Sequence, residues 1–379
     1  MRDHRCLIAF LALAATLSGC RDLPTVPSTG TLELGLVTTG EDIDSDGFLM
    51  AVDGGSPQML PANGIVRVIE TPGTHTLALS GEAFNCDIAA VPASVSITAG
   101  ETMHVNVLAS CAPFLRNTIV YTSDEFGVVE VMVMRPDGSR RQRLTTDQQG
   151  YAAPVISPDG RSIAVASYLG GSWGGIYLLD RFGHGRTKLV GLSDLDGSPA
   201  WSPDGATLAF QSELPGPYGS YGRIFLVNRD GSNARQLSPE TGDYSYDDGP
   251  SWSPDGTRLV FSRNGTLFVI GADGSGLTSL GIAGMHPSWS PDGTHIAYDA
   301  WVGNAISIFV ADANGGNLRR LTTSAYQDQM ARWSPDGNQI LFERAEGVTH
   351  LYAIRPDGTG EAKIGSDPHN DDWASWGPS

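Results

Sequence analysis

Short apolar runs separated by turn residues dominate the chain from about residue 117 onward. A run such as Leu208-Ala209-Phe210 is followed by a loop, by a second run such as Ile224-Phe225-Leu226-Val227, and by a short segment such as Gln236-Leu237-Ser238. These β-branched, aromatic and aliphatic residues, with Gly, Pro and Asp between them, are typical of buried β-strands. No stretch shows a helical period of apolar residues. The pattern predicts an all-β structure whose strands are grouped in fours.

One pentapeptide recurs along this region. Copies of Trp-Ser-Pro-Asp-Gly, two of them degenerate, begin at Ile156, Trp201, Trp252, Trp289, Trp333 and Trp376, and their prolines are 45, 51, 37, 44 and 43 residues apart. Pro presets φ, Asp bonds to its own backbone and Gly accepts a positive φ, so each copy predicts a tight turn. A repeat of this length with four strands is typical of a β-propeller. We predict six blades over residues 113–379, with the tryptophans packed between adjacent blades.

The two ends of the repeat region complement each other. The unit that starts at Asn117-Thr118-Ile119-Val120-Tyr121 has three strands and no preceding Trp-Ser strand, while the last inner strand, near Ala374-Ser375-Trp376, has no strands after it. Sharing one blade would hide both sheet edges. We therefore predict a six-bladed propeller closed by the C-terminal strand.

The pentapeptide resembles the repeat of the TolB-type propeller family, in which this turn starts each blade. The resemblance covers roughly residues 117–379. It implies the propeller fold and, for TolB itself, work in the bacterial envelope with a peptidoglycan-associated lipoprotein and an inner-membrane energy-transducing complex. TolB is soluble and has a different amino-terminal domain, so these partners are not transferred to this chain. The same repeat also occurs beside peptidase domains and in some lyases, so it indicates the fold better than the function.

Residues 1–19 have the composition of an export signal. Two arginines, Arg2 and Arg5, precede an apolar run that is too short to span a membrane as a mature helix. Leu17-Ser18-Gly19-Cys20 resembles a bacterial lipobox, which implies cleavage before Cys20 and lipidation of its thiol. The alternative is an ordinary secretory signal with an incidental cysteine. By the same resemblance, Arg21 after the cysteine favours the outer membrane, facing the periplasm, and residues 20–30 are predicted to be a lipidated tether.

Residues 31–112 lack the repeat and show six alternating strand patterns, which predict a small β-sandwich. The segment resembles the carboxypeptidase-regulatory and PEGA-like sandwiches of exported bacterial proteins. With Cys6 removed and Cys20 lipidated, Cys86 and Cys111 are the remaining pair. In an oxidising periplasm they are expected to form a disulfide worth roughly 3 kcal/mol, and the alternative is two free buried thiols.

An acidic turn in the same domain matches part of a calcium-loop pattern. Asp42, Asp44 and Asp46 precede Gly47, and Asp53 stands where such loops usually place Glu. The flanking segments are predicted strands, which argues against an EF-hand. A calcium ion is one hypothesis for this turn, and the alternative is that Asp and Gly only shape the backbone. We predict no other cofactor.

Composition narrows the choice of partners. The chain has 24 Lys+Arg against 42 Asp+Glu, a net charge of −18, which argues against binding of nucleic acid or of an anionic membrane surface by the folded part. Gly170-Gly171-Ser172-Trp173-Gly174 satisfies the pattern of a hydrolase nucleophile elbow, but strands and not a strand and a helix flank it. The eight histidines show no metal-ligand spacing.

The loops that enter the inner strands supply the candidate ligand-binding residues. In a propeller these loops lie at one mouth of the central channel, and here they carry Tyr151, Asp194, Asp196, Asp247, Asp248, His286, Asp328, Asp371 and Asp372. Seven carboxylates converging on one funnel would attract a metal ion or the Lys and Arg side chains of a partner. The alternative is that the aspartates cap their own turns.

The sequence therefore predicts an exported, lipid-anchored propeller that is not an enzyme and that binds a protein or a glycan at the bacterial cell envelope. The alternative is an envelope hydrolase or lyase with its site in the propeller channel, which would need titratable side chains that converge on one mouth.

Overall fold

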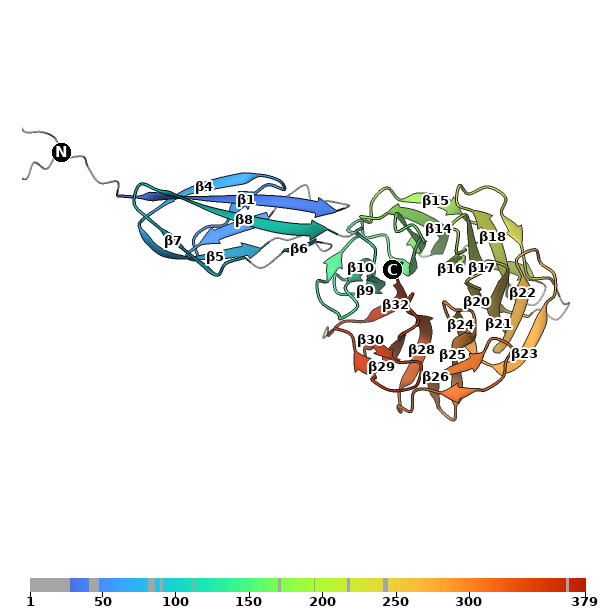
Figure 1. Ribbon diagram of the computed structural model, residues 1–379. Helices are drawn as coiled ribbons and strands as arrows, with labels where there is room; N and C mark the ends of the chain where they lie inside the picture. Colours follow the sequence, from blue (N-terminus) through green and yellow to red (C-terminus); the bar gives the residue numbers. More distant parts are fainter. Residues whose placement is uncertain are drawn as a thin grey trace, which may run out of the picture. The chain divides into compact units, whose positions relative to one another are not determined.

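The computed structural model describes residues 28–40, 48–80, 86–88, 91–111, 113–169, 172–193, 195–216, 219–240, 245–365 and 368–379. Every regular element in these ranges is a β-strand, which confirms the all-β prediction (Figure 1). None of the described residues belongs to a helix long and apolar enough to cross a membrane. The chain divides into two compact units. The first takes its described residues from Met1–Thr38, Ser45–Gly81 and Ile88–Ala109, and the second takes the others.

The amino-terminal strands form a small sandwich of two four-stranded sheets, as predicted. One sheet has the order β4-β1-β8-β6 and the other β3-β2-β5-β7. Their bounds are β1 Gly30–Gly40, β2 Phe48–Val52, β3 Gln58–Leu60, β4 Ile65–Glu70, β5 Gly73–Ser80, β6 Cys86–Ile88, β7 Ser94–Ile97 and β8 Thr102–Cys111. Strand β1 alternates strictly: Leu32, Leu34 and Leu36 are buried while the residues between them are half-buried or exposed. This period of two leaves one apolar face on each sheet, and the core lies between the two faces.

The remaining strands form six four-stranded sheets arranged around a centre, the blades of a propeller (Figure 1). Blade 1 contains β12 Tyr151–Ile156, β13 Ser162–Leu169, β14 Ser172–Asp180 and β15 Thr187–Val190, and blade 2 contains β16 Gly197–Trp201, β17 Thr207–Gly216, β18 Gly219–Asn228 and β19 Arg235–Gln236. Blade 3 contains β20 Asp247–Trp252, β21 Arg258–Arg263, β22 Thr266–Gly271 and β23 Thr278–Ala283, and blade 4 contains β24 Met285–Trp289, β25 His295–Val302, β26 Ala305–Asp312 and β27 Arg319–Arg320. Blade 5 contains β28 Gln327–Trp333, β29 Ile340–Ala345, β30 Thr349–Ile354 and β31 Ala362–Lys363.

Blade 6 is built from both ends of the repeat region. Its strands are β9 Ile119–Ser123, β10 Glu130–Met134, β11 Gln142–Arg143 and β32 Asp371–Trp376, in the order β11-β10-β9-β32. Trp376 pairs with Ile119 and Asp371 with Ser123, so the C-terminal strand is the innermost strand of the sheet that the first repeat begins. The predicted closure is confirmed, and the ring has no open edge at its centre.

The recurring turn and the recurring tryptophan have separate structural jobs. In the turn of blade 2, Asp204 Oδ1 accepts hydrogen bonds from Ser202 Oγ at 2.6 Å and from the Ala206 amide at 3.0 Å. The same pair of bonds recurs in the other four copies that contain Ser-Pro-Asp-Gly, so these aspartates cap their own turns. The Trp252 indole N–H donates to the carbonyl oxygen of Ala200 in the preceding blade at 3.1 Å, and the ring packs at the seam between the two blades.

Candidate functional site

The six inner strands line a central channel, and each carries a β-bulge at the same place. The pairing of every inner strand with its neighbour shifts register once. The bulge residue has a positive φ in each blade, and the six residues are Ala153, Ser198, Gly249, His286, Met330 and Trp373. Five of them are not glycine, and such residues rarely adopt this conformation. The bulges therefore point a defined set of side chains toward the axis of the ring.

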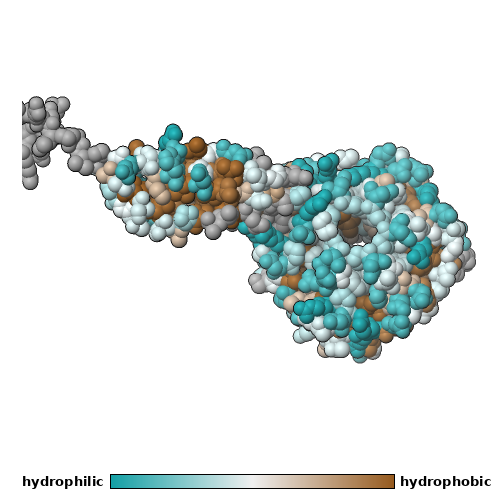
Figure 2. Space-filling model, viewed as in Figure 1, coloured by the Kyte–Doolittle hydropathy of each residue, from teal (hydrophilic) through white to brown (hydrophobic). Residues whose placement is uncertain are grey.

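The channel is wide on the side of the Pro-Asp-Gly turns and narrow at the bulges. The wide part has a volume of about 300 Å³, and all six blades supply its walls, with Trp252 and Trp333 among the aromatic residues and Pro203 and Pro335 among the prolines. The narrow part, about 20 Å³, is lined by bulge residues, His286 and Trp373 among them. Arg332 lines both parts. Figure 2 shows the hollow at the centre of the propeller, with apolar residues inside it and a largely hydrophilic surface around it.

Charged side chains from blades 4 and 5 gather beside the narrow part. His286 Nδ1 lies 3.0 Å from Oδ1 of Asp299, which also accepts the Met330 amide at 3.1 Å. Arg332 donates to the Ala331 carbonyl oxygen at 2.9 Å. Glu343, which is 3% exposed, accepts the amide of Trp373 from blade 6. These contacts tie three blades together at the axis.

Burial and mutual charge shift the pKa values of this cluster. Burial raises the pKa of Glu343 to about 8, and the charge of Asp372 adds to the effect. Burial also lowers the pKa of Arg332, against the opposing charges of Glu343, Asp299 and Asp248. For His286, burial acts to lower the pKa, but the charge and the hydrogen bond of Asp299 outweigh it and the pKa is raised. The cluster therefore has groups that change protonation near neutral pH.

Three of the predicted ligand-binding aspartates are not available to a ligand. Asp247 and Asp328 are fully buried, and each forms a two-pronged ion pair inside its own blade, with Arg263 at 2.6 and 2.7 Å and with Arg344 at 2.6 and 3.0 Å. Asp196, 1% exposed, accepts the amides of two residues of its own loop. The prediction that seven carboxylates converge on one funnel is therefore wrong for these three aspartates. Their side chains turn into the blade, where an arginine or backbone amides compensate the free-energy cost of burying a charge.

The other predicted residues are spread around the ring. Asp248 accepts Ser198 Oγ from the neighbouring blade at 2.9 Å, and Tyr151 donates to Asp147 at 2.7 Å. Asp371 is 3.6 Å from Arg141, and burial raises its pKa to about 6. Burial also raises the pKa of Asp372, against a hydrogen bond from Thr349. Asp194 lies outside the described residues.

The remaining predictions concern the first 112 residues and one hairpin. Cys86 and Cys111 form a disulfide with an S–S distance of 2.01 Å. Cys20, Asp42, Asp44 and Asp46 lie outside the described residues, so lipidation and the calcium loop stay predictions. Asp53, the fourth calcium candidate, accepts the Thr76 amide at 2.7 Å and contacts His75 Nδ1 at 2.7 Å.

The Gly-x-Ser-x-Gly match lies where strand β14 begins, at Ser172, opposite Leu169 of β13. Residues 172–174 of the match therefore belong to a β-strand, where a nucleophile elbow would lead into a helix. Within the described ranges, no group of three or more His, Cys, Asp or Glu side chains could hold a metal ion.

Sequence reasoning missed Arg332, Asp299 and Glu343. Alignment of the repeats with one another would have singled out each of these residues as a charge at an unusual position. Arg332 directly precedes Trp333, where the other blades have Val155, Ala200, Ser251, Ser288 and Ser375. Asp299 and Glu343 directly follow the aromatic residue of the second strand, Tyr298 and Phe342, within otherwise buried segments. A charge at a repeat position that is small or neutral elsewhere is a candidate for function.

The architecture is that of a six-bladed propeller with tight turns on one face and a narrow, charged constriction in its channel. The family model described as TolB beta propeller domain matches residues 105–379, which is more than half of the chain. The chain therefore belongs to this family.

Individual relatives are more distant. A curated Protein TolB homolog from Chlorobium luteolum is 29% identical over 147 residues, which are 38% of this chain and 31% of the relative's length. The crystal structure of TolB from Acinetobacter baumannii has a TM-score of 0.61 at 20% identity and covers 69% of this chain and 67% of its own. A putative TolB from Agrobacterium tumefaciens has a TM-score of 0.54 at 21% identity, covering 69% and 91%. At these identities, the structures show a shared fold.

Proposed function

We propose that this propeller is a non-enzymatic binding module of the bacterial cell envelope and that its channel receives a segment of a partner protein. The observation that carries the proposal is the wide part of the channel, about 300 Å³, with Trp and Pro side chains on its walls and Arg332 at its narrow end. Aromatic and proline surfaces bury area with little loss of conformational entropy, and a charged group at depth adds orientation. Membership in the TolB propeller family supports the envelope location.

Affinity capture from the native envelope tests the channel. Ala200 lines the wide part at the repeat position that Arg332 fills in blade 5, so Ala200→Trp narrows the channel without removing a side-chain hydrogen bond. We expect this variant to lose the proteins that wild type retains. Ala362→Trp on the exposed edge strand β31 is the matched control and should retain them. Equal capture by both variants would move the binding surface out of the channel.

We also propose that Cys20 is lipidated and anchors the chain to the outer membrane, facing the periplasm. The lipobox-like Leu17-Ser18-Gly19-Cys20 supports this. Cys20→Ser should move the protein from the membrane fraction to the soluble periplasmic fraction and abolish labelling with radioactive palmitate. A labelled, membrane-bound variant would contradict the anchor.

A second candidate, an envelope hydrolase or lyase, is favoured by one observation: His286 and Arg332 line the constriction, and Glu343, which accepts the amide of the bulge residue Trp373 beside it, has its pKa raised to about 8 by burial. A proton donor and a cation at the same place suit acid–base chemistry. Glu343→Gln separates the two candidates, because it should abolish turnover of an envelope glycan or peptide by an enzyme but leave capture by a binding module within about twofold of wild type. If the partner is a glycan and not a protein, a glycosidase and not a protease should release the material captured on the propeller.

A further inference from the structure

The four grooves between neighbouring blades from blade 1 to blade 5, on the side of the Pro-Asp-Gly turns, are built on one plan. The tryptophan of one blade forms the floor. The preceding blade supplies one wall through two residues: the aspartate of its Pro-Asp-Gly turn and the first residue of its second strand. The blade that holds the tryptophan supplies the other wall, through the residue that follows its third strand. Because the same backbone recurs in each groove, a side chain that fills one groove indicates which chemical group an equivalent groove can bind.

An arginine fills the groove between blades 1 and 2. Arg229, which follows strand β18, holds its guanidinium carbon 5.4 Å from the ring centre of Trp201. Its Nη1 donates to Asp159 Oδ2 at 2.8 Å, and its Nη2 donates to Ser162 Oγ at 3.0 Å. An aromatic face, a carboxylate and a hydroxyl together satisfy the flat face and two of the donors of one guanidinium.

The groove between blades 3 and 4 is filled by an arginine from the opposite wall. Arg258, the first residue of β21, lies 5.1 Å from the ring centre of Trp289. The position after strand β26 is the small Ala313. With their arginines in place, Trp201 is 9% exposed and Trp289 is 5% exposed. Two grooves therefore bury their tryptophan under a guanidinium that the chain itself supplies.

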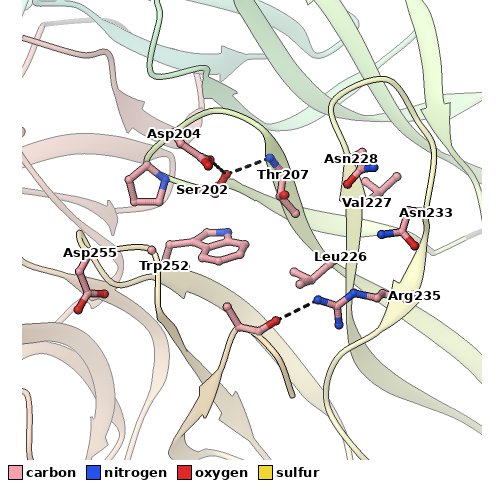
Figure 3. A pocket seen from close by; sticks show the side chains of 13 residues that line it. Ser202, Asp204, Thr207, Leu226, Val227, Asn228, Asn233, Arg235, Trp252 and Asp255 are labelled. Carbon is pink, nitrogen blue, oxygen red and sulfur yellow. Dashed lines mark hydrogen bonds between the residues drawn. The ribbon is translucent and has the colours of Figure 1, made fainter. Parts of the chain in front are cut away.

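The groove between blades 2 and 3 has the same three partners and no stacked guanidinium. Its floor is the half-buried Trp252, its walls carry Asp204 and Thr207, and Ala272 stands where Arg229 stands in the groove between blades 1 and 2. A cavity of about 420 Å³ lies between them (Figure 3). Among the described residues, no guanidinium stacks on Trp252, and the turn engages Oδ1 of Asp204 but not Oδ2. The arrangement is therefore a guanidinium site that lacks its guanidinium.

One cation already lies at the edge of this cavity. Arg235 donates to the carbonyl oxygen of Ala272 at 3.0 Å, and Figure 3 shows its guanidinium across the indole of Trp252 from Asp204. The hydrogen bond holds Arg235 at the rim of the groove and leaves the wall formed by Asp204 and Thr207 open. The pKa of Asp204 is lowered by hydrogen bonds from Ser202 and from the Ala206 amide, so its carboxylate is ionised at neutral pH.

We propose that the groove between blades 2 and 3 is a receptor for one arginine side chain of a partner protein, whose guanidinium stacks on Trp252 and bonds to Asp204 and Thr207 as Arg229 bonds in the neighbouring groove. The proposal rests on the proposed protein-binding function and adds a second contact, which shares Trp252 with the channel wall but has Asp204 and Thr207 to itself. The net charge of −18 favours approach of a basic segment.

The groove between blades 4 and 5 does not repeat the site. It has a cavity of about 280 Å³ above Trp333, but His295 stands at the position of Ser162 and Thr207, with its ring 6.4 Å from the indole. The hydroxyl acceptor is missing there, and a histidine lies beside the face on which a guanidinium would stack. Of these four grooves, we therefore assign the site to the one between blades 2 and 3.

Titration with L-arginine amide, followed by NMR of the tryptophan indole N–H groups in the ¹⁵N-labelled full chain in neutral detergent, tests the site. We expect a saturable shift of the Trp252 resonance, with a dissociation constant of roughly millimolar. Citrulline amide, which has the same shape without the charge, should bind at least about tenfold more weakly. Asp204→Asn keeps the turn's Oδ1 acceptor and should weaken arginine binding by roughly tenfold.

Two further variants control for the fold. Ala272→Arg supplies the missing guanidinium from the chain itself and should abolish the response. Ala313→Arg makes the same change in the groove that Arg258 already fills and should leave the response as in wild type. The proposal is overturned if Trp252 does not respond to arginine amide, if Ala272→Arg responds like wild type, or if N-acetylglucosamine and not arginine amide shifts the resonance. The capture experiment with Ala200→Trp tests the channel, and the arginine titration tests the groove. Failure of one experiment does not decide the outcome of the other, so the two proposals can be contradicted separately.

Discussion

At the scale of the single residue, Glu343 is a buried carboxyl group beside the constriction of the channel with a strongly raised pKa. Burial raises its pKa to about 8, above the ordinary value of 4.5. The folded protein therefore keeps a proton that the unfolded chain releases at lower pH, so this group contributes stability at acidic pH that is lost as the pH rises from about 4.5 to 8. Asp371, with a pKa of about 6, acts in the same direction over a lower range.

Glu343→Gln should remove this dependence. The amide keeps an acceptor for the Trp373 N–H and has no proton to lose. Relative to wild type, the free energy of unfolding of the variant should rise by up to about 1.4 kcal/mol per pH unit between about pH 5 and 8. Urea unfolding at several pH values measures the difference. The exposed Glu240→Gln should track wild type, and parallel pH curves for Glu343→Gln and wild type would contradict the shifted pKa.

At the scale of the strand and the turn, most of the fold is predictable from the sequence because its causes are local. The Ser-Pro-Asp-Gly turns close through bonds between residues two apart, such as Ser253 to Asp255, and the apolar runs between them are long enough for only one strand each. Strands of two residues, such as β11 and β19, contain too few apolar positions for their bounds to be predicted from the sequence.

The bulges could not be predicted in the same way. A positive φ at Ala153, Met330 or Trp373 is not favoured by the residue itself, and the neighbouring strand and the closed ring impose it. The central cluster has the same origin. His286 and Asp299 meet because β24 pairs with β25 inside blade 4. Trp373 of blade 6 meets Glu343 of blade 5 across 30 residues, and the closed ring brings these two together. The aspartates chosen from the loops were visible in the sequence, but their buried partners, such as Arg263 and Arg344, lie 16 residues further on.

The C-terminal strand is the element on which the ring depends. Strand β32 pairs with β9 in blade 6 and packs against blade 1, where Ser375 Oγ donates to the carbonyl oxygen of Pro154 at 3.0 Å. Deletion of residues 371–379 should expose the edge of β9 and lower the melting temperature of the whole propeller by at least about 10 °C. Differential scanning calorimetry measures the change. A melting temperature equal to that of the full chain would show that the ring does not need this closure.

At the scale of the whole molecule, the chain separates two tasks. The six repeats supply a rigid ring because each blade buries its face against the next. Differences between repeats then supply the chemistry: Arg332, Asp299 and Glu343 at the constriction, and the exchange of Arg229 for Ala272 from one groove to the next. Both proposed contacts are departures from the repeat on an otherwise regular scaffold.

Site-specific photo-cross-linking in cells tests the central claim, that the channel receives a partner protein, most directly. A photoreactive phenylalanine in place of Trp333 puts the reactive group in the wall of the wide part of the channel by exchanging one aromatic ring for another, and one at position 362 places it on the outer edge of blade 5. We predict a discrete, protease-sensitive adduct from position 333 and none from position 362. An adduct from position 362 only, or no protein adduct from position 333, would contradict the account.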